Sequence, residues 1–152
     1  MSQEAKALLE EFWDMKIPID PEFFAKKLGL SVERKDLGLQ SGYFDADSKV
    51  IVVNDREVDE RQRFTIAHEL GHFCLNHGSS FRDTASPGWF RKGNPSHETE
   101  ANKFAAELLM PAIAVKILID VRKVRDSAEL RKAFGVSSQA LHWRLKSLGY
   151  FI

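Results

Sequence analysis

The sequence predicts an α+β fold, in which a small antiparallel sheet is surrounded by helices and followed by a helical C-terminal part. Three observations support this prediction. The run Val50–Val53 is β-branched and uninterrupted, which is typical of a buried strand. Amphipathic helical patterns precede this run, and a longer series of them follows it. The length of 152 residues suits a single domain covering 1–152.

Turn and capping residues set the expected order of elements. Two short helices are expected near 3–15 and 21–29, the second opened by Pro21. Turn residues favour an antiparallel hairpin between the last two of three strands, which are expected at Ser31–Asp36, Ser41–Asp45 and Lys49–Val53. Further helices are expected at about 59–76, from 96 to before Pro111, and at 112–121, 127–134 and 138–148. The polar segment Gly78–Pro95 is expected to be a loop.

Composition and charge indicate a cytoplasmic protein. Lys plus Arg and Asp plus Glu both number 22, so the chain has no general attraction to nucleic acid or to an anionic membrane. The single cysteine, Cys74, excludes an intramolecular disulfide and points to a reducing compartment. No stretch is long enough to span a bilayer, and the first fifteen residues are amphipathic rather than typical of a signal peptide.

The segment from His68 to His72 carries the clearest chemical signal. Two histidines four positions apart project from one helix face, so their imidazole nitrogens can share one Zn²⁺ ion. Glu69 lies about a third of a turn away, where it can accept a proton from a water molecule that attacks a peptide carbonyl. The alternative is a chance match on the surface of an amphipathic helix. The apolar residues on both sides of the motif favour the metal site.

A zinc site of this type needs a third protein ligand, commonly a carboxylate. Helical periodicity separates the two candidates, Glu98 and Glu100. Glu98 shares its face with four apolar residues, Ala101, Ala105, Leu108 and Leu109. Glu100 shares its face mainly with Lys103 and Glu107, along with Phe104. Glu98 is therefore predicted to point inward and to complete the site, whereas Glu100 is interpreted as a solvated charge.

Two blocks of sequence then resemble the ImmA/IrrE family of zinc metallopeptidases. The first block is Arg63–His72 and the second is Glu98–Pro111. The stretch Ile19–Gly29 is similar to the opening of the family pattern, so the resemblance spans about 17–148. In this resemblance His68, His72 and Glu98 match the metal ligands, and Glu69 matches the catalytic glutamate. Asn102 matches a position that supports the ligands.

The resemblance implies a zincin-like fold and a cytoplasmic zinc endopeptidase. The implied protein substrate is a helix-turn-helix transcriptional repressor. Two alternatives stay open: an anti-repressor that binds its partner without cutting it, and a DNA-binding regulator that uses the C-terminal helices. Nucleic acid is the less favoured partner, and no membrane partner is expected.

The C-terminal subregion 113–152 underlies the DNA-binding alternative. It carries eight basic and three acidic side chains, and Glu129–Leu141 resembles a helix-turn-helix. The simpler interpretation is that these helices pack on the core, because Trp143, Leu145 and Leu148 give the last helix a large apolar face.

Four further residues are weaker candidates. Cys74 is interpreted as a buried structural residue rather than a redox switch. Tyr43, His77 and His97 are candidates for stabilising an oxyanion, although a solvated or hydrogen-bonded histidine is the simpler interpretation of the last two.

Overall fold

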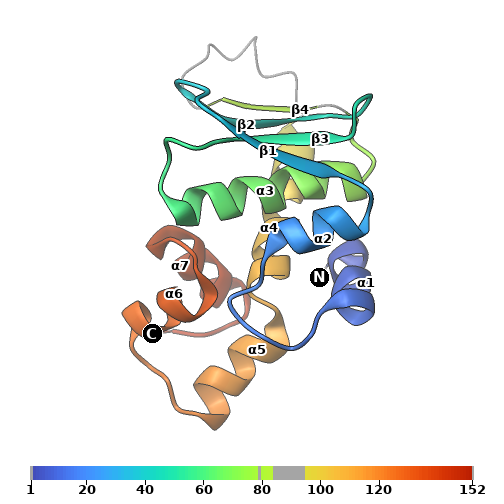
Figure 1. The fold of residues 1–152 in the computed structure, drawn as a ribbon. Helices are drawn as coiled ribbons and strands as arrows, with labels where there is room; N and C mark the ends of the chain where they lie inside the picture. Colours follow the sequence, from blue (N-terminus) through green and yellow to red (C-terminus); the bar gives the residue numbers. More distant parts are fainter. Residues whose placement is uncertain (1, 79, 84–94, 152) are drawn as a thin grey trace.

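Helices cover one face of a four-stranded sheet in the computed structural model, which describes residues 2–78, 80–83 and 95–151 (Figure 1). The strands are β1 (Ser31–Lys35), β2 (Gln40–Asp45), β3 (Val50–Asn54) and β4 (Ser80–Asp83). The helices are α1 (Gln3–Phe12), α2 (Pro21–Lys27), α3 (Asp59–Cys74), α4 (Pro95–Leu109), α5 (Ala112–Lys116), α6 (Ser127–Phe134) and α7 (Ser138–Ser147). A π-helical turn, Ile117–Val121, continues α5. Among the described residues, none of the helices has the length and apolar character needed to cross a bilayer.

The sheet is mixed, with the strand order β1-β3-β2-β4. Strands β2 and β3 pair antiparallel, which confirms the predicted hairpin. The prediction of a purely antiparallel sheet is wrong, because β1 pairs parallel to β3, with Ser31 opposite Val50. The chain reverses direction between β1 and β2 and again between β2 and β3, so β1 and β3 run in the same direction, and they are neighbours because β2 lies on the far side of β3.

The expectation of a loop over Gly78–Pro95 is wrong for Ser80–Asp83, which form the strand β4. It pairs antiparallel with β2, and its four residues are mostly polar. A short polar segment carries little strand signal of its own, so this strand depends on its pairing with β2. The rest of the expected loop, residues 79 and 84–94, lies outside the described residues.

Helix α3 lies between the sheet and α4, and it is buried on all sides over the eight residues Thr65–His72. Two glycines allow this close packing. A Cβ atom on Gly42 of β2 would lie 2.6 Å from both Thr65 Cγ2 and the Val52 carbonyl oxygen. A Cβ atom on Gly71 would lie 3.0 Å from Cδ1 of Phe104, a fully buried side chain of α4.

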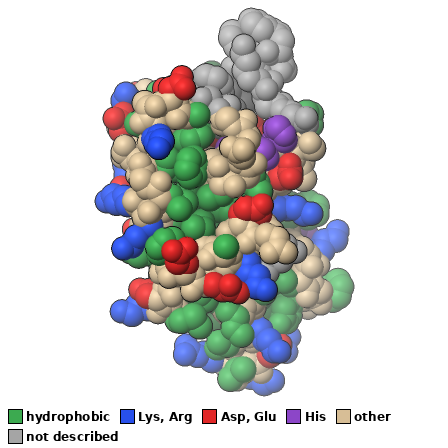
Figure 2. Space-filling view, turned by 90° about the vertical axis from the view of Figure 1, so that its right-hand side faces the viewer, with side chains coloured by type: hydrophobic (Ala, Val, Ile, Leu, Met, Phe, Trp, Pro, Cys, Tyr) green, Lys and Arg blue, Asp and Glu red, His purple; other side chains and the backbone are tan. Residues whose placement is uncertain are grey.

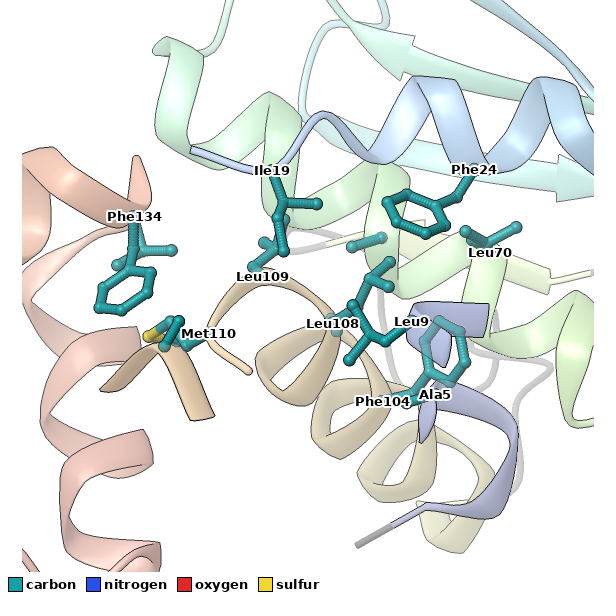
Figure 3. Packing of buried hydrophobic residues seen from close by; sticks show 14 of the residues in the cluster. Ala5, Leu9, Ile19, Phe24, Leu70, Phe104, Leu108, Leu109, Met110 and Phe134 are labelled. Carbon is teal, nitrogen blue, oxygen red and sulfur yellow. The ribbon is translucent and has the colours of Figure 1, made fainter. Parts of the chain in front are cut away.

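The hydrophobic core lies where the first four helices meet. In Figure 3, Leu9 of α1, Phe24 of α2, Leu70 of α3 and Leu108 of α4 lie close together. Helix α4 is buried over a wider surface than its sequence pattern predicts.

Two residues assigned to the solvated face of α4 are in fact buried. Phe104 is 0% exposed and Glu107 is 7% exposed. Glu107 is covered by the N-terminus of the chain, since α1 packs on α4 and the Ser2 backbone N–H donates a hydrogen bond to Glu107 Oε2 at 2.6 Å. Phe104 is covered by α3, where it packs against Gly71.

The C-terminal helices pack on the rest of the fold, as the simpler interpretation expected. The buried Arg144 of α7 donates a hydrogen bond to the Met110 carbonyl oxygen at 2.9 Å. Arg63 of α3 donates to the carbonyl oxygens of Ile19, Phe134 and Gly135. Gly135 has a positive φ of 66°, and any Cβ there would lie 2.8 Å from Arg63 Nε. The inclusion of Trp143 in the buried face is wrong, because its side chain is 56% exposed.

The approach of α3 to the sheet generates a prediction about Gly42. Replacing it with alanine (Gly42→Ala) is expected to lower the free energy of unfolding by about 1–3 kcal/mol, because the added methyl group overlaps a backbone oxygen that cannot easily move. Urea denaturation measures this change. The control is Ser48→Ala in the exposed turn before β3, which is expected to stay within about 0.5 kcal/mol. Equal stabilities for Gly42→Ala and the unmodified chain would contradict the close packing described here.

Candidate metal centre

The structure brings the three predicted metal ligands together. His68 Nε2 lies 2.7 Å from Glu98 Oε2, and His72 Nε2 lies 3.1 Å from the same oxygen. The two Nε2 atoms lie 3.1 Å from each other. Three atoms from two helices therefore surround one point.

Helix geometry and helix packing explain this convergence. The spacing of four residues places His68 and His72 on the same side of α3, one turn apart. Glu98 comes from the first turn of α4, which packs directly against α3. Gly71 lies beside His72 in the sequence and contacts Phe104, so the close approach of the two helices occurs next to the site.

The donor set fits a metal ion. Two imidazole nitrogens and one carboxylate form a common ligand set of catalytic zinc, and they leave one coordination position open. In a tetrahedral zinc site the ligand atoms lie roughly 3.3–3.4 Å apart, because the bonds are about 2.0–2.1 Å long. The observed separations of 2.7–3.1 Å are slightly shorter. Both histidines are 1% exposed, so their lone pairs face each other in the interior, where a shared cation would stabilise them.

Two opposing effects act on the pKa of the Glu98 carboxyl group. Burial raises it, whereas hydrogen bonds donated by protonated rings of His68 and His72, and the positive charge of those rings, would lower it, and the net effect is a lowered pKa. The Glu98 side chain is 32% exposed, so it forms the solvent-facing member of the cluster.

Asn102 contacts His68 on the side of its ring opposite the metal cluster, which agrees with the supporting position that the resemblance implied. Its Oδ1 atom lies 2.8 Å from His68 Nδ1. An amide oxygen can only accept a hydrogen bond, so Nδ1 of His68 carries the proton. In the neutral ring, Nε2 then has a free lone pair that faces His72 and Glu98.

Glu69 lies in the same buried part of α3, and it is 0% exposed. Its carboxylate is not one of the three converging ligand atoms of His68, His72 and Glu98. A fully buried carboxylate is costly unless positive charge or hydrogen-bond donors surround it. A metal ion held by the neighbouring histidines would supply such charge.

A second group of ionisable residues, His77, His97 and Glu100, lies beside the first. Figure 2 shows histidine side chains gathered at one place on the surface, with acidic side chains nearby. The rings of His77 and His97 stack with their centroids 3.9 Å apart and their planes at 6°. A metal ion bonds in the plane of an imidazole ring, so these two parallel rings cannot both reach one ion in this arrangement.

Burial shifts the pKa values of both His77 and Cys74 towards the neutral form of the side chain. Burial, reinforced by the charges of His97 and His72, lowers the pKa of His77 against the opposing effect of Glu100. Burial, reinforced by Glu4, raises the pKa of Cys74 to about 12, so the thiol stays protonated near neutral pH. This agrees with the interpretation of Cys74 as a structural residue.

Sequence reasoning missed the position of His77. Its Nδ1 atom lies 3.0 Å from His72 Nδ1, on the side of the His72 ring that faces away from Glu98. This position does not suit the stabilisation of an oxyanion. His97 stacks on His77, and Tyr43 lies in β2 opposite Val52.

Comparisons with known proteins agree with the site. Residues 25–146 match the family model of the IrrE N-terminal-like domain. The chain is 32% identical over 114 residues to the radiation response metalloprotease IrrE of Deinococcus radiodurans, covering 74% of this chain and 31% of that protein. It is 33% identical over 92 residues to the protein of the same name from Deinococcus deserti, covering 60% of this chain and 33% of that protein. The chain therefore spans about a third of the length of these curated relatives.

A solved structure shares the fold. It is a Mycobacterium tuberculosis transcriptional regulator, with a TM-score of 0.64 and 19% identity, and the match covers 95% of this chain and 46% of that one. At this identity the likeness concerns the fold alone. The match of the family model over most of the chain, together with the identity to two metalloproteases, shows that this protein belongs to the IrrE N-terminal-like family.

Proposed function

We propose that this protein is a zinc-dependent endopeptidase in which His68, His72 and Glu98 hold the metal and Glu69 is the general base. The observation that carries the proposal is the convergence of three ligand atoms within 3.1 Å of one another, in a chain related to metalloproteases. The proposal treats 1–152 as one zincin-like domain that acts in the cytoplasm.

The division of labour follows from the chemistry of each side chain. A zinc ion held by His68, His72 and Glu98 would supply a Lewis acid for the scissile carbonyl and for the attacking water. Glu69 accepts the proton of the attacking water and passes it to the departing amine. The burial of Glu69 excludes bulk water from the proton transfer, and Asn102 keeps His68 in the tautomer that binds metal.

The proposed substrate is a helix-turn-helix transcriptional repressor, on the strength of the family resemblance. Among the described strands, β1 and β4 are the two edges of the sheet, and β4 is the one that contacts α3, so we place the binding of an extended peptide at β4. A substrate segment bound there would run alongside the sheet that covers α3.

Two other functions compete with this proposal. An anti-repressor would bind the same partner without cutting it, and the mass of the partner after incubation separates these cases. A DNA-binding regulator is supported by the basic C-terminal region. Salt-dependent binding to duplex DNA would favour that function.

The role of Glu69 is tested by Glu69→Gln, which keeps the size of the side chain and removes the basic carboxylate. Peptide cleavage is expected to fall by at least about 10²-fold, the lower range for loss of a general base. Zinc content is expected to stay at the level of the unmodified protein. Both quantities are measured on the same sample, by metal analysis and by cleavage of a repressor substrate. Cleavage near the unmodified rate would exclude Glu69 as the base.

The ligand set is tested by comparing Glu98→Ala with Glu100→Ala. The first variant removes one of the three converging atoms and is expected to weaken zinc binding by more than about 100-fold. The second removes an exposed carboxylate and is expected to change affinity by less than about threefold. Competition with a colorimetric chelator measures both. Loss of zinc in Glu100→Ala with retention in Glu98→Ala would overturn the assignment.

A further inference from the structure

His77 is attached to His72 through both its backbone and its ring. The backbone N–H of His77 donates a hydrogen bond to the His72 carbonyl oxygen at 2.9 Å. The ring nitrogens Nδ1 of the two residues lie 3.0 Å apart. The side chain of His77 is only 7% exposed, so water competes little for this contact.

The end of α3 creates this double contact. Asn76 has a positive φ of 62°, and its N–H donates to the Phe73 carbonyl oxygen at 3.1 Å. The hydrogen bond from Asn76 to Phe73 and the one from His77 to His72 are the two hydrogen bonds of a Schellman motif. In such a motif the residue after the left-handed position lies over the third residue from the helix end, which here is His72.

The direction of the ring hydrogen bond follows from Glu100. Its Oε1 atom lies 3.4 Å from His77 Nε2, and a carboxylate accepts hydrogen bonds. The proton of His77 is therefore on Nε2, and its Nδ1 atom has a free lone pair. This lone pair accepts the proton on Nδ1 of His72, which leaves Nε2 of His72 free to face His68 and Glu98.

We propose that His77 is a positioning residue of the metal site, which accepts a hydrogen bond from His72 Nδ1 and so fixes the tautomer and orientation of His72. This inference rests on the proposed metal site. His77 contacts Nδ1 of His72 as Asn102 contacts Nδ1 of His68. Asn102 lies in α4, whereas His77 follows the end of α3, the helix that carries His72. The ring of His97 stacks on His77, and the exposed carboxylate of Glu100 accepts from His77 Nε2 at a place where water can substitute for it.

The test compares three variants by zinc affinity, measured by chelator competition. His77→Leu fills the space without an acceptor and is expected to weaken zinc binding by about 10–100-fold, the range for loss of such a partner. His77→Asn places an amide oxygen near the position of Nδ1 and is expected to restore affinity to within about threefold of the unmodified protein. The matched control, His142→Leu, makes the same substitution at an exposed histidine of α7, away from the metal site, and is expected to change affinity by less than about threefold.

A second measurement separates positioning from folding. Urea unfolding of the metal-free protein shows whether each variant keeps its fold, and His77→Ala replaces His77→Leu if the latter does not fold. The absorption spectrum of the Co²⁺-loaded protein is expected to change in His77→Leu and to return towards that of the unmodified protein in His77→Asn.

The outcomes distinguish this inference from the proposed function. If the unmodified protein binds no zinc, the proposed function fails. If the unmodified protein binds zinc and His77→Leu binds it equally well, only the role of His77 is overturned. Equal weakening in the folded Leu and Asn variants would also overturn it, because the loss would then come from packing rather than from the missing acceptor.

Discussion

The contact between α3 and α4 is the constraint on which the site depends. It brings two imidazole nitrogens of one helix and a carboxylate oxygen of the other within 3.1 Å of one another. Groups of this kind repel or remain unsatisfied in a protein interior unless a proton or a cation lies between them. The sheet on one side and α4 on the other bury both histidines at this point, so solvent reaches the cluster only at Glu98.

The two glycines at this contact have complementary effects. Gly42 lets α3 approach the sheet, and Gly71 lets Phe104 of α4 approach α3. Substitutions there would move the histidines relative to Glu98 without touching any of the three side chains. The precision of the site is therefore set by packing as well as by the ligands themselves.

Each histidine has its own support on the side away from the cluster. Asn102 contacts Nδ1 of His68 from α4, and His77 contacts Nδ1 of His72 from the end of α3. Both contacts leave Nε2 available for a metal. A helix that ends two residues later or earlier would present a different residue to His72, so the length of α3 is itself part of the arrangement.

Much of this could be predicted from the sequence, because helical spacing is a local property. The position of Glu98 near the two histidines followed from its face of α4, and the antiparallel hairpin followed from its turn residues. The missed features depend on contacts between distant segments. The strand β4 exists through pairing with β2, Glu107 is buried by the N-terminus, and Trp143 is exposed because α7 turns other residues inward.

The contact of His77 with His72 was also missed, although it had a local signal. Asn76 is a suitable residue for the left-handed end of a helix, and a helix ending there places the next residue over His72. The sequence pattern predicts a helix as far as Asn76, two residues beyond the observed end at Cys74, and a helix of that length would not place His77 over His72. A capping argument at the C-terminus of α3 would have identified it.

Anomalous diffraction at the zinc absorption edge, from crystals grown with zinc, tests the central claim most directly. The account predicts one peak about 2.0–2.2 Å from each of His68 Nε2, His72 Nε2 and Glu98 Oε2. A peak bound instead by His77, His97 and Glu100, or a zinc site at the two histidines without Glu98, would contradict it.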